Sequence, residues 1–293
     1  MLRPNLAAAS ALFTAPPVTR FAPSPTGYLH LGHVVNALYT WGVAGALGGR
    51  VLLRIEDHDR IRSRPEYEAA LLEDLDWLGF VADDGRRPVM RQSDAPDIYR
   101  DALNELRRTQ HIYACDCSRT EIGGERYTGR CRTRGLPEVP GRGVRLRFDE
   151  EVVRVHDLLS GPIEQTPYNQ CGDLLLRDRD GNWTYQFSVA VDDLRQGVTL
   201  VIRGSDLAAS TGRQVLLAKQ LGRGTPLHFL HHPLIIGPYG QKLSKSAGDT
   251  GVRELRANGL RPEEVIGRAA ALVGLTDTPR PVSATDVSKL FET

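Results

Sequence analysis

The chain has 293 residues, a formal net charge of +1, 41% hydrophobic residues and 25% charged residues. These values are typical of a soluble globular protein and exclude one that wraps nucleic acid by bulk charge, although one basic face is compatible with them. No apolar run approaches the roughly 18 residues that span a bilayer. Four cysteines without a secretory signal indicate a reducing compartment, so we expect a cytoplasmic protein whose cysteines bind metal or pack.

The first elements predict a strand, a loop and a helix behind an N-terminal extension. Residues 1–17 are rich in alanine, contain one arginine and no acidic residue, and are expected to be disordered. Val18 to Phe21 is a short strand that enters a loop punctuated by proline and glycine. Apolar residues then recur with helical spacing from Val34 to Trp41. The apolar run from Val51 to Ile55 is typical of a buried parallel strand.

The middle of the chain interrupts this alternation. Ser63 and Glu66 form a capping box that opens a helix, and the helix is expected to end near Gly79. The next segment, 111–170, is rich in Gly, Pro and Arg, before a strand from Val198 to Ile202 and an amphipathic helix from Pro262 to Val273. We therefore predict an α/β fold, in which a Rossmann-type parallel sheet (18–110 and 171–235) is split by an insertion (111–170) and followed by a short helical segment (236–293).

Two short motifs indicate phosphate chemistry. His30-Leu31-Gly32-His33 follows the first loop, where backbone N–H groups and the positive end of a helix dipole form an anion site. The two histidines share a helix face, and Gly32 lets a nucleoside approach the backbone. Only four of the 37 Lys and Arg residues are lysines, and Lys242 and Lys245 lie together around Ser244. Lysine differs from arginine as a compact, mobile partner for phosphate.

The cysteines predict a metal site. Cys115, Cys117 and Cys131 lie in a loop rich in Gly and Arg with little apolar sequence, which suits a structural Zn²⁺ site. The residues leave the fourth ligand open among Tyr127, His111 and water. Cys171 lies apart, and we interpret it as a small buried apolar residue.

The chain resembles a known enzyme family. The histidine and lysine motifs resemble the HIGH and KMSKS signatures of class I aminoacyl-tRNA synthetases, with Leu243 in place of Met, a swap of similar volume. The stretches 20–27, 54–57, 183–186 and 201–204 resemble the glutamyl branch in the same order, so the likeness runs from about Val18 to Ser246. It implies that the carboxylate of glutamate attacks the α-phosphate of ATP, with catalysis by positioning and charge stabilisation.

The resemblance also implies the role of individual residues. The histidines and lysines would contact the triphosphate, and ATP binding would involve His30, Gly32, His33, Lys242, Ser244 and Lys245, with Mg²⁺ carried on the phosphates. Glutamate would be held by Arg20, Ser24, Glu56, Tyr185 and Arg203. The two arginines follow strands, where open α/β sheets bind ligands, and a guanidinium suits a carboxylate. Glu56 would hold the ammonium, although a helix cap or surface pair explains it equally well. For Arg54, Asp57 and Asp59 we expect local ion pairs. The family's Cys, Cys, Tyr, Cys zinc ligands match Cys115, Cys117, Tyr127 and Cys131.

Length distinguishes the branches of this family. Only 47 residues follow Ser246, fewer than the helical anticodon-binding portion of a standard glutamyl-tRNA synthetase needs. The chain therefore resembles the glutamyl-queuosine tRNA(Asp) synthetases, which implies tRNA-independent activation of L-glutamate and its transfer to queuosine in the anticodon stem-loop of tRNA(Asp). We expect a monomer. Phosphate contact and simple solvation are equally good interpretations of the insertion's Arg126, Arg130, Arg132 and Arg134.

Two alternatives remain open. One is a minimal synthetase that charges the 3′ end of tRNA(Glu). The other is a non-catalytic paralogue that binds glutamyl-adenylate or RNA, which the intact histidine and lysine motifs disfavour. A small-molecule nucleotidyltransferase would have no reason to carry Arg20, Glu56 and Arg203 together.

Overall fold

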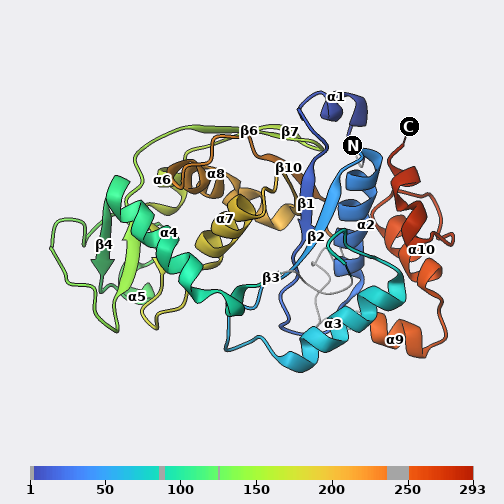
Figure 1. Ribbon diagram of the computed structural model, residues 1–293, viewed down its shortest axis with the longest axis horizontal. Helices are drawn as coiled ribbons and strands as arrows, with labels where there is room; N and C mark the ends of the chain where they lie inside the picture. Colours follow the sequence, from blue (N-terminus) through green and yellow to red (C-terminus); the bar gives the residue numbers. More distant parts are fainter. Residues whose placement is uncertain (1–2, 86–89, 125, 236–250, 293) are drawn as a thin grey trace.

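The computed structural model describes residues 3–85, 90–124, 126–235 and 251–292 and confirms the predicted α/β class (Figure 1). The first elements in chain order are α1 (Leu6–Ser10), β1 (Val18–Phe21), α2 (Leu31–Ala46), β2 (Arg50–Ile55), α3 (Pro65–Leu78), β3 (Met90–Arg91), η1 (Gln92–Asp94), α4 (Pro96–Thr109), β4 (Ile112–Cys115) and α5 (Arg119–Ile122). They are followed by β5 (Gly143–Leu146), β6 (Val153–Asp157), β7 (Gly161–Gln165), α6 (Pro167–Cys171), β8 (Leu174–Arg177) and α7 (Tyr185–Arg195). The last are β9 (Leu200–Gly204), η2 (Ser205–Ser210), α8 (Thr211–Gln220), β10 (His228–His232), α9 (Val252–Ala257), α10 (Pro262–Leu272) and η4 (Ala284–Leu290).

The parallel strands run outward from a central pair. β1 pairs with β2 and β2 with β3, while β9 pairs with β10 and β10 with β6, all in parallel. β9 lies beside β1, where the backbone N–H of Thr199 donates to the carbonyl of Val18 at 2.9 Å. The chain therefore moves in one direction from β1 through α2 to β2, and in the other from β9 through α8 to β10. Such a reversal opens a ligand crevice at the carboxyl ends of the strands.

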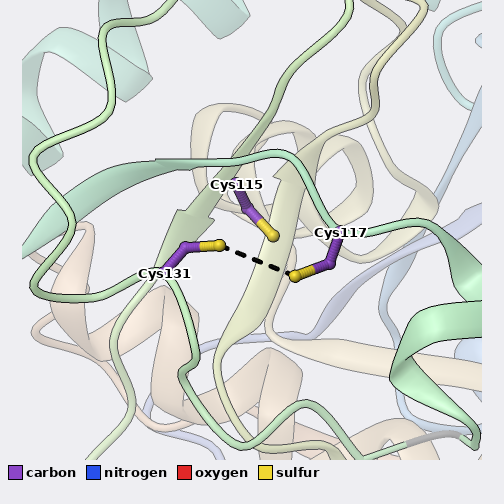
Figure 2. A group of neighbouring side chains, drawn as sticks. All are labelled: Cys115, Cys117 and Cys131. Atoms are coloured by element: carbon purple, nitrogen blue, oxygen red, sulfur yellow. Dashed lines mark hydrogen bonds between the residues drawn. The ribbon is translucent and has the colours of Figure 1, made fainter.

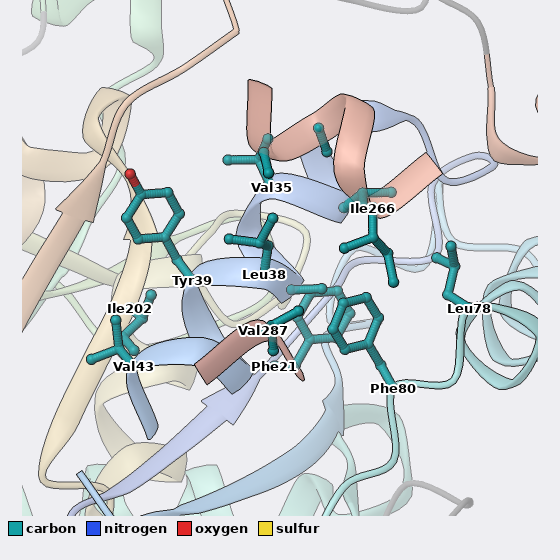
Figure 3. Close-up of a cluster of buried hydrophobic side chains, with 14 of the residues drawn as sticks. Phe21, Val35, Leu38, Tyr39, Val43, Leu78, Phe80, Ile202, Ile266 and Val287 are labelled. Carbon is teal, nitrogen blue, oxygen red and sulfur yellow. The ribbon is translucent and has the colours of Figure 1, made fainter. Parts of the chain in front are cut away.

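Helix α2 connects this sheet to the C-terminal helices. Its Leu38, Tyr39 and Val43 are fully buried between the strands and the C-terminal segment (Figure 3). Figure 1 shows α2 and α10 on one side of β1 and β2, with α7 and α8 on the other. A Cβ atom at Gly42 would lie 2.2 Å from the Phe291 ring, so glycine is required where the end of the chain packs on α2. This packing fixes the helix that begins with the histidine motif.

The inserted segment contributes to two sheets. Its strands β4 and β5 form an antiparallel sheet with β8, which follows residue 170. Its β6–β7 hairpin extends the main sheet instead, since Asp157 of β6 pairs with Phe229 of β10. The segment is therefore hydrogen-bonded to the core along one edge. Asp157, the last residue of β6, lies next to the ligand-binding end of the sheet.

The N-terminal extension differs from the disorder expected of it. Residues 6–10 form helix α1, and the Asn5 side chain accepts a hydrogen bond from the backbone N–H of Ala8 at 3.1 Å. Arg3 donates to the carbonyl of Leu275 at 2.6 Å, and Ala9 is buried. The described part of the extension is thus tied to the C-terminal segment by contacts that its composition does not reveal.

The predicted capping box is wrong. The N-cap of α3 is Arg64, which makes no side-chain capping bond, and the helix begins at Pro65. The hydroxyl of Ser63 is buried without a hydrogen-bond partner, and Glu66 pairs with Arg64 at 3.8 Å. The predicted stop is confirmed, because Gly79 ends the helix in the left-handed conformation (φ 84°).

Within the described ranges, no helix is both long and apolar enough to cross a membrane.

Candidate active site

A cavity of about 440 Å³ opens at the carboxyl ends of β1, β2 and β9. It is lined by eight of the residues that the sequence analysis assigns to ligands, namely Arg20, Ser24, His30, Gly32, His33, Glu56, Tyr185 and Arg203. They come from three strand ends, the loop after β1 and the starts of α2 and α7. Lys242, Ser244 and Lys245 lie outside the described residues.

The two histidine side chains form hydrogen bonds to backbone N–H groups in the first turn of α2. The His30 Nδ1 atom accepts from the backbone N–H of Gly32 at 3.0 Å, and the His33 Nδ1 atom accepts from the backbone N–H of His30 at 3.2 Å. Because each Nδ1 is an acceptor, each neutral ring is assigned its proton on Nε2, which makes Nε2 a donor suited to a phosphate oxygen. A Cβ atom at Gly32 would lie 2.8 Å from the His30 ring. Glycine is therefore needed to seat the histidine itself.

A buried ionic network supports Arg20 and Glu56. The Asp193 carboxylate accepts from Arg20 Nε at 3.0 Å and from Arg54 at 2.8 Å, and Arg54 also donates to Glu56 Oε1 at 2.8 Å. Burial alone would raise the pKa of Asp193, but the guanidiniums of Arg20 and Arg54 lower it. Glu56, which is 5% exposed, is thereby held at the cavity wall with one oxygen engaged. The predicted structural role of Arg54 is confirmed.

Burial also shifts the neighbouring carboxyl group. It raises the pKa of Asp192 to about 6, although Arg54 and a hydrogen bond from Gln92 oppose the shift. The Asp192 oxygens accept from the Gln92 amide at 2.7 Å and from the Tyr99 hydroxyl at 3.0 Å. The sequence predicts local ion pairs for two acidic residues after β2. Asp59 forms one with Arg62 at 2.6 Å, whereas Asp57 accepts a hydrogen bond from the backbone N–H of Ser93 at 2.8 Å.

Arg203 is the second buried cation at the cavity. It is 4% exposed, and its donors reach His231 at 3.1 Å, Gln214 at 2.6 Å and Thr211 at 2.9 Å, together with the carbonyl of Leu207. In the part of the chain that the structure describes, no carboxylate is among its hydrogen-bond or ion-pair partners. Burial lowers the pKa of Arg203, and Arg20 adds to the effect. An anionic ligand would relieve both.

The cysteine cluster lies in a separate small core (Figure 2). The sulfur atoms of Cys115, Cys117 and Cys131 lie within 4.8 Å of one another, and this group contains neither Cys171 nor His111. The Tyr127 hydroxyl lies 3.4 Å from the Cys115 sulfur and accepts from the backbone N–H of Cys131 at 2.8 Å. The donor set is therefore three thiols and one phenol oxygen, which fits tetrahedral Zn²⁺.

The protonation of this cluster also suits a metal. Burial and the neighbouring thiols raise the pKa of Cys117 to about 11, and burial raises that of Tyr127. Although burial alone would raise the pKa of Cys131, hydrogen bonds that involve Tyr127 and Asp116 lower it. Zn²⁺ binding would deprotonate all of its ligands. The Arg145 guanidinium stacks 3.8 Å above the Tyr127 ring, where it favours a phenolate. Cys171 packs among apolar residues and contacts the carbonyl of Pro167, as predicted.

Comparison with known proteins identifies the family. The sequence profile of the class I tRNA synthetases (E and Q), catalytic domain, matches residues 17–291. The chain belongs to this family. It is accordingly a ligase, and the resemblance stated from its motifs is confirmed.

Three relatives describe its place within the family. A protein of Symbiobacterium thermophilum named glutamyl-Q tRNA(Asp) synthetase is 41% identical over 93% of this chain and 91% of the relative. A protein of the same name from Rhodobacter capsulatus is 39% identical over 85% of this chain and 98% of the relative. The crystal structure of a glutamate tRNA ligase from Elizabethkingia meningosepticum in complex with its amino acid superposes with a TM-score of 0.78 at 30% identity. That match covers 94% of this chain and 64% of the ligase.

Sequence reasoning missed several residues of this synthetase's cavity. His232, Asn36 and Asp206 also line it. The His232 Nε2 atom lies 3.0 Å from the Asn36 amide, and the ring stacks on Tyr39 with 5.3 Å between centroids. His232 ends β10, so the rule that led to Arg203, ligand residues at carboxyl strand ends, would have found it.

The insertion's arginines are mostly engaged within the protein. Arg132 forms a two-pronged ion pair with the buried Asp173, at 2.5 and 2.6 Å. Arg134 pairs with Asp116 at 2.6 Å, and Arg126 donates to the carbonyl of Tyr168. For Arg132 in particular, a structural role replaces both of the interpretations made from the sequence, because its partner is buried.

The residues that flank 236–250 both adjoin the cavity. Ile235 lines it, and Gly251 pairs with His30 in an isolated bridge, supported by a 3.0 Å bond from the Val252 N–H to the Leu29 carbonyl. The chain thus leaves the described structure at the cavity and returns to it beside the histidine motif.

Proposed function

We propose that this enzyme activates L-glutamate with ATP in the absence of tRNA and transfers the glutamyl group to queuosine in the anticodon of tRNA(Asp). The observation that carries the proposal is the pair of buried arginines, Arg20 and Arg203, at one cavity with Glu56. Two cations and one anion match the two carboxylates and one ammonium of glutamate.

The amino acid would be oriented by these charges. Four of the five guanidinium N–H groups of Arg203 donate within the protein. Arg203 would therefore hold the side-chain carboxylate through its remaining N–H and its positive charge, and Arg20 would take an oxygen of the second carboxylate. Glu56 would receive the ammonium through the oxygen opposite Arg54, with Ser24 and Tyr185 as neutral hydrogen-bonding groups. An arginine-lined site should reject glutamine strongly, because its neutral amide leaves a buried cation unpaired.

The nucleotide would be bound at the start of α2. The Nε2–H groups of His30 and His33 would donate to phosphate oxygens as charge develops on them, next to the positive end of the helix dipole. Lys242 and Lys245, with Ser244, would contact the triphosphate, as the sequence analysis predicts. Mg²⁺ would arrive on ATP, since it usually stays on phosphates and water.

Zinc would be structural. Cys115, Cys117, Tyr127 and Cys131 would hold one ion per chain and fix the loop between β4 and β5. All four protein positions would be filled, and no open coordination site would remain for a substrate.

The acceptor is proposed from the relatives. The two proteins named glutamyl-Q tRNA(Asp) synthetase match this chain over nearly their whole length. The likeness to a glutamate tRNA ligase supports a second candidate, the charging of the 3′ end of tRNA(Glu). The monomeric state and cytoplasmic location stay predictions from the sequence.

The test is transfer of labelled glutamate with ATP to tRNA(Asp) with queuosine, tRNA(Asp) without it, and tRNA(Glu), followed by nuclease mapping. We expect label only in the anticodon loop of queuosine-containing tRNA(Asp), and glutamate-dependent pyrophosphate exchange without any tRNA. Label at the 3′ end of tRNA(Glu) would instead establish the second candidate.

A further inference from the structure

Within the described ranges, the hydrogen-bond partners of Arg203 are neutral acceptors. Its Nε donates to the His231 Nε2 atom, one terminal nitrogen donates to the Gln214 carbonyl oxygen, and the other donates to the Thr211 hydroxyl and the Leu207 carbonyl. These groups fix the plane of the guanidinium and give it no direct ion pair. The face of the guanidinium packs on the Phe229 ring at 5.3 Å.

His231 can accept from Arg203 only in one tautomer. The Asp157 Oδ2 atom lies 2.7 Å from His231 Nδ1 and also accepts from the His231 backbone N–H at 2.9 Å. An ionised carboxylate has no proton to give, so Nδ1 carries the ring proton and Nε2 presents a lone pair. Although burial alone would raise it, bonds from His231 and Ser160 lower the pKa of Asp157 to about 2, so the carboxylate is ionised at neutral pH.

The same geometry explains why the Asp157 carboxylate contacts His231 and does not contact Arg203 directly. A carboxylate in direct contact with Arg203 would orient it equally well but would pair with its charge. Inside the protein, where the dielectric constant is low, that pairing would remove most of the attraction for a ligand carboxylate. The imidazole transmits the orientation set by Asp157, and Gln214 supplies a second fixed acceptor, itself donating to Gln186 at 2.8 Å.

We infer that Asp157, His231 and Gln214 are positioning residues that fix Arg203 through neutral acceptors, so that its charge is reserved for the side-chain carboxylate of the amino acid. The inference rests on the proposed function and adds to it a source of selectivity for glutamate over glutamine. It also gives the β6–β7 hairpin of the inserted segment a part in amino-acid binding, because Asp157 is the last residue of β6.

The first test removes the imidazole. In glutamate-dependent pyrophosphate exchange, His231→Ala is expected to raise KM for glutamate about tenfold or more with kcat within about threefold, because orientation of a ligand contact is lost. His231→Gln, whose carbonyl oxygen can accept from Arg203, should recover most of the loss. The matched control is His228→Ala on the same strand, whose ring packs on Phe13 rather than on Arg203 and which should leave KM unchanged.

The second test adds a charge without removing volume. Gln214→Glu places a carboxylate against Arg203 and should preserve folding, since it supplies a partner to a buried cation. We expect KM for glutamate to rise about a hundredfold, with a smaller preference for glutamate over glutamine, while the thermal midpoint is kept or raised. A structural role for Gln214 alone would not reduce the preference.

The outcomes separate the inference from the function on which it rests. The inference alone would be overturned if the wild-type protein catalyses exchange and KM for glutamate is unchanged in His231→Ala. It would also be overturned if KM for glutamate in Gln214→Glu lies within threefold of the wild-type value. If calorimetry shows that the wild-type protein binds no glutamate and exchange is absent, the proposed function fails and the inference falls with it.

Discussion

Two buried arginines at this active site differ in their partners: carboxylates contact one guanidinium, and neutral groups contact the other. Arg54, fully buried beneath the cavity, contacts Asp193 and Glu56 at 2.8 Å and Asp192 at 4.0 Å. Burial alone would lower the pKa of Arg54, but these carboxylates overcome it and raise the pKa. Arg203 is almost as buried, has only neutral partners among the described residues, and has a lowered pKa.

The difference separates a structural cation from one prepared for a ligand. The network around Arg54 contains its own counter-charges and holds Glu56 and, through Asp193, Arg20. Among the described residues, the surroundings of Arg203 fix its orientation but place no carboxylate in hydrogen-bond contact with it. The protein therefore carries the cost of a buried cation without a direct ion pair until an anion binds. Perturbed charges of this kind are a physical mark of functional sites.

The largest expected effect follows from removing the unpaired cation. Arg203→Gln should raise KM for glutamate about 1,000-fold, because a buried, charge-assisted contact with the ligand carboxylate is lost. Its stability should be unchanged or higher, since the folded state no longer buries an uncompensated charge. Pyrophosphate exchange and urea denaturation measure the two quantities. A large loss of stability would break the comparison, because Arg203 would then be a structural residue like Arg54.

Removing the paired cation should have the reverse outcome. Arg54→Met removes the shared cation from the buried Glu56 and Asp192 carboxylates and leaves Asp193 with Arg20 alone. The free energy of unfolding should fall by about 3–5 kcal/mol. The matched control is Arg62→Met, which breaks an exposed pair with Asp59 and should cost at most about 1 kcal/mol. Similar losses in the two variants, measured by urea denaturation, would show that burial of the Arg54 network does not matter.

The cysteine cluster adds a third case, in which a metal ion would compensate buried charges of the protein. Three thiolates buried within 4.8 Å of one another would repel unless Zn²⁺ compensates them. Cys131→Ser should therefore lose the one zinc ion per chain, measured by atomic emission, and lower the thermal midpoint. Cys171→Ser is the control and should retain the metal. Full zinc content in Cys131→Ser would contradict the assigned ligand set.

The smallest effect concerns pH. Asp157 has a folded-state pKa of about 2, below the value of about 3.9 for an unfolded Asp, so its contribution to stability is present above pH 4 and is lost as pH falls through 2. The difference corresponds to about 2 kcal/mol. Asp157→Asn should flatten the fall of the unfolding free energy between pH 4 and 2 by about this amount. Parallel curves for variant and wild type would exclude an ionised Asp157 that is stabilised in the folded state.

The local elements of this protein were predictable where one segment carries its own signal. The strand from Val18 to Phe21, the helix containing Val34 to Trp41 and the glycine stop at Gly79 are confirmed, because periodicity and turn chemistry act between near neighbours. The predicted capping box is wrong because a contact with a distant part of the chain overrides the local signal. Ser63 has the right spacing to Glu66, but the backbone of Arg64 bonds to Pro25 and tertiary contact moves the start of the helix.

The order of the motifs along the sequence determined the family, eight of the cavity residues and the three cysteines that lie together, since each motif is short and chemically distinctive. Only the tertiary structure decided how their charges are balanced. Asp193 meets Arg20 from 173 residues away, and Asp157 meets His231 from 74 residues away. Such pairs are set by which strands lie side by side in the folded sheet. A linear pattern records neither that proximity nor the burial that makes an unpaired charge costly.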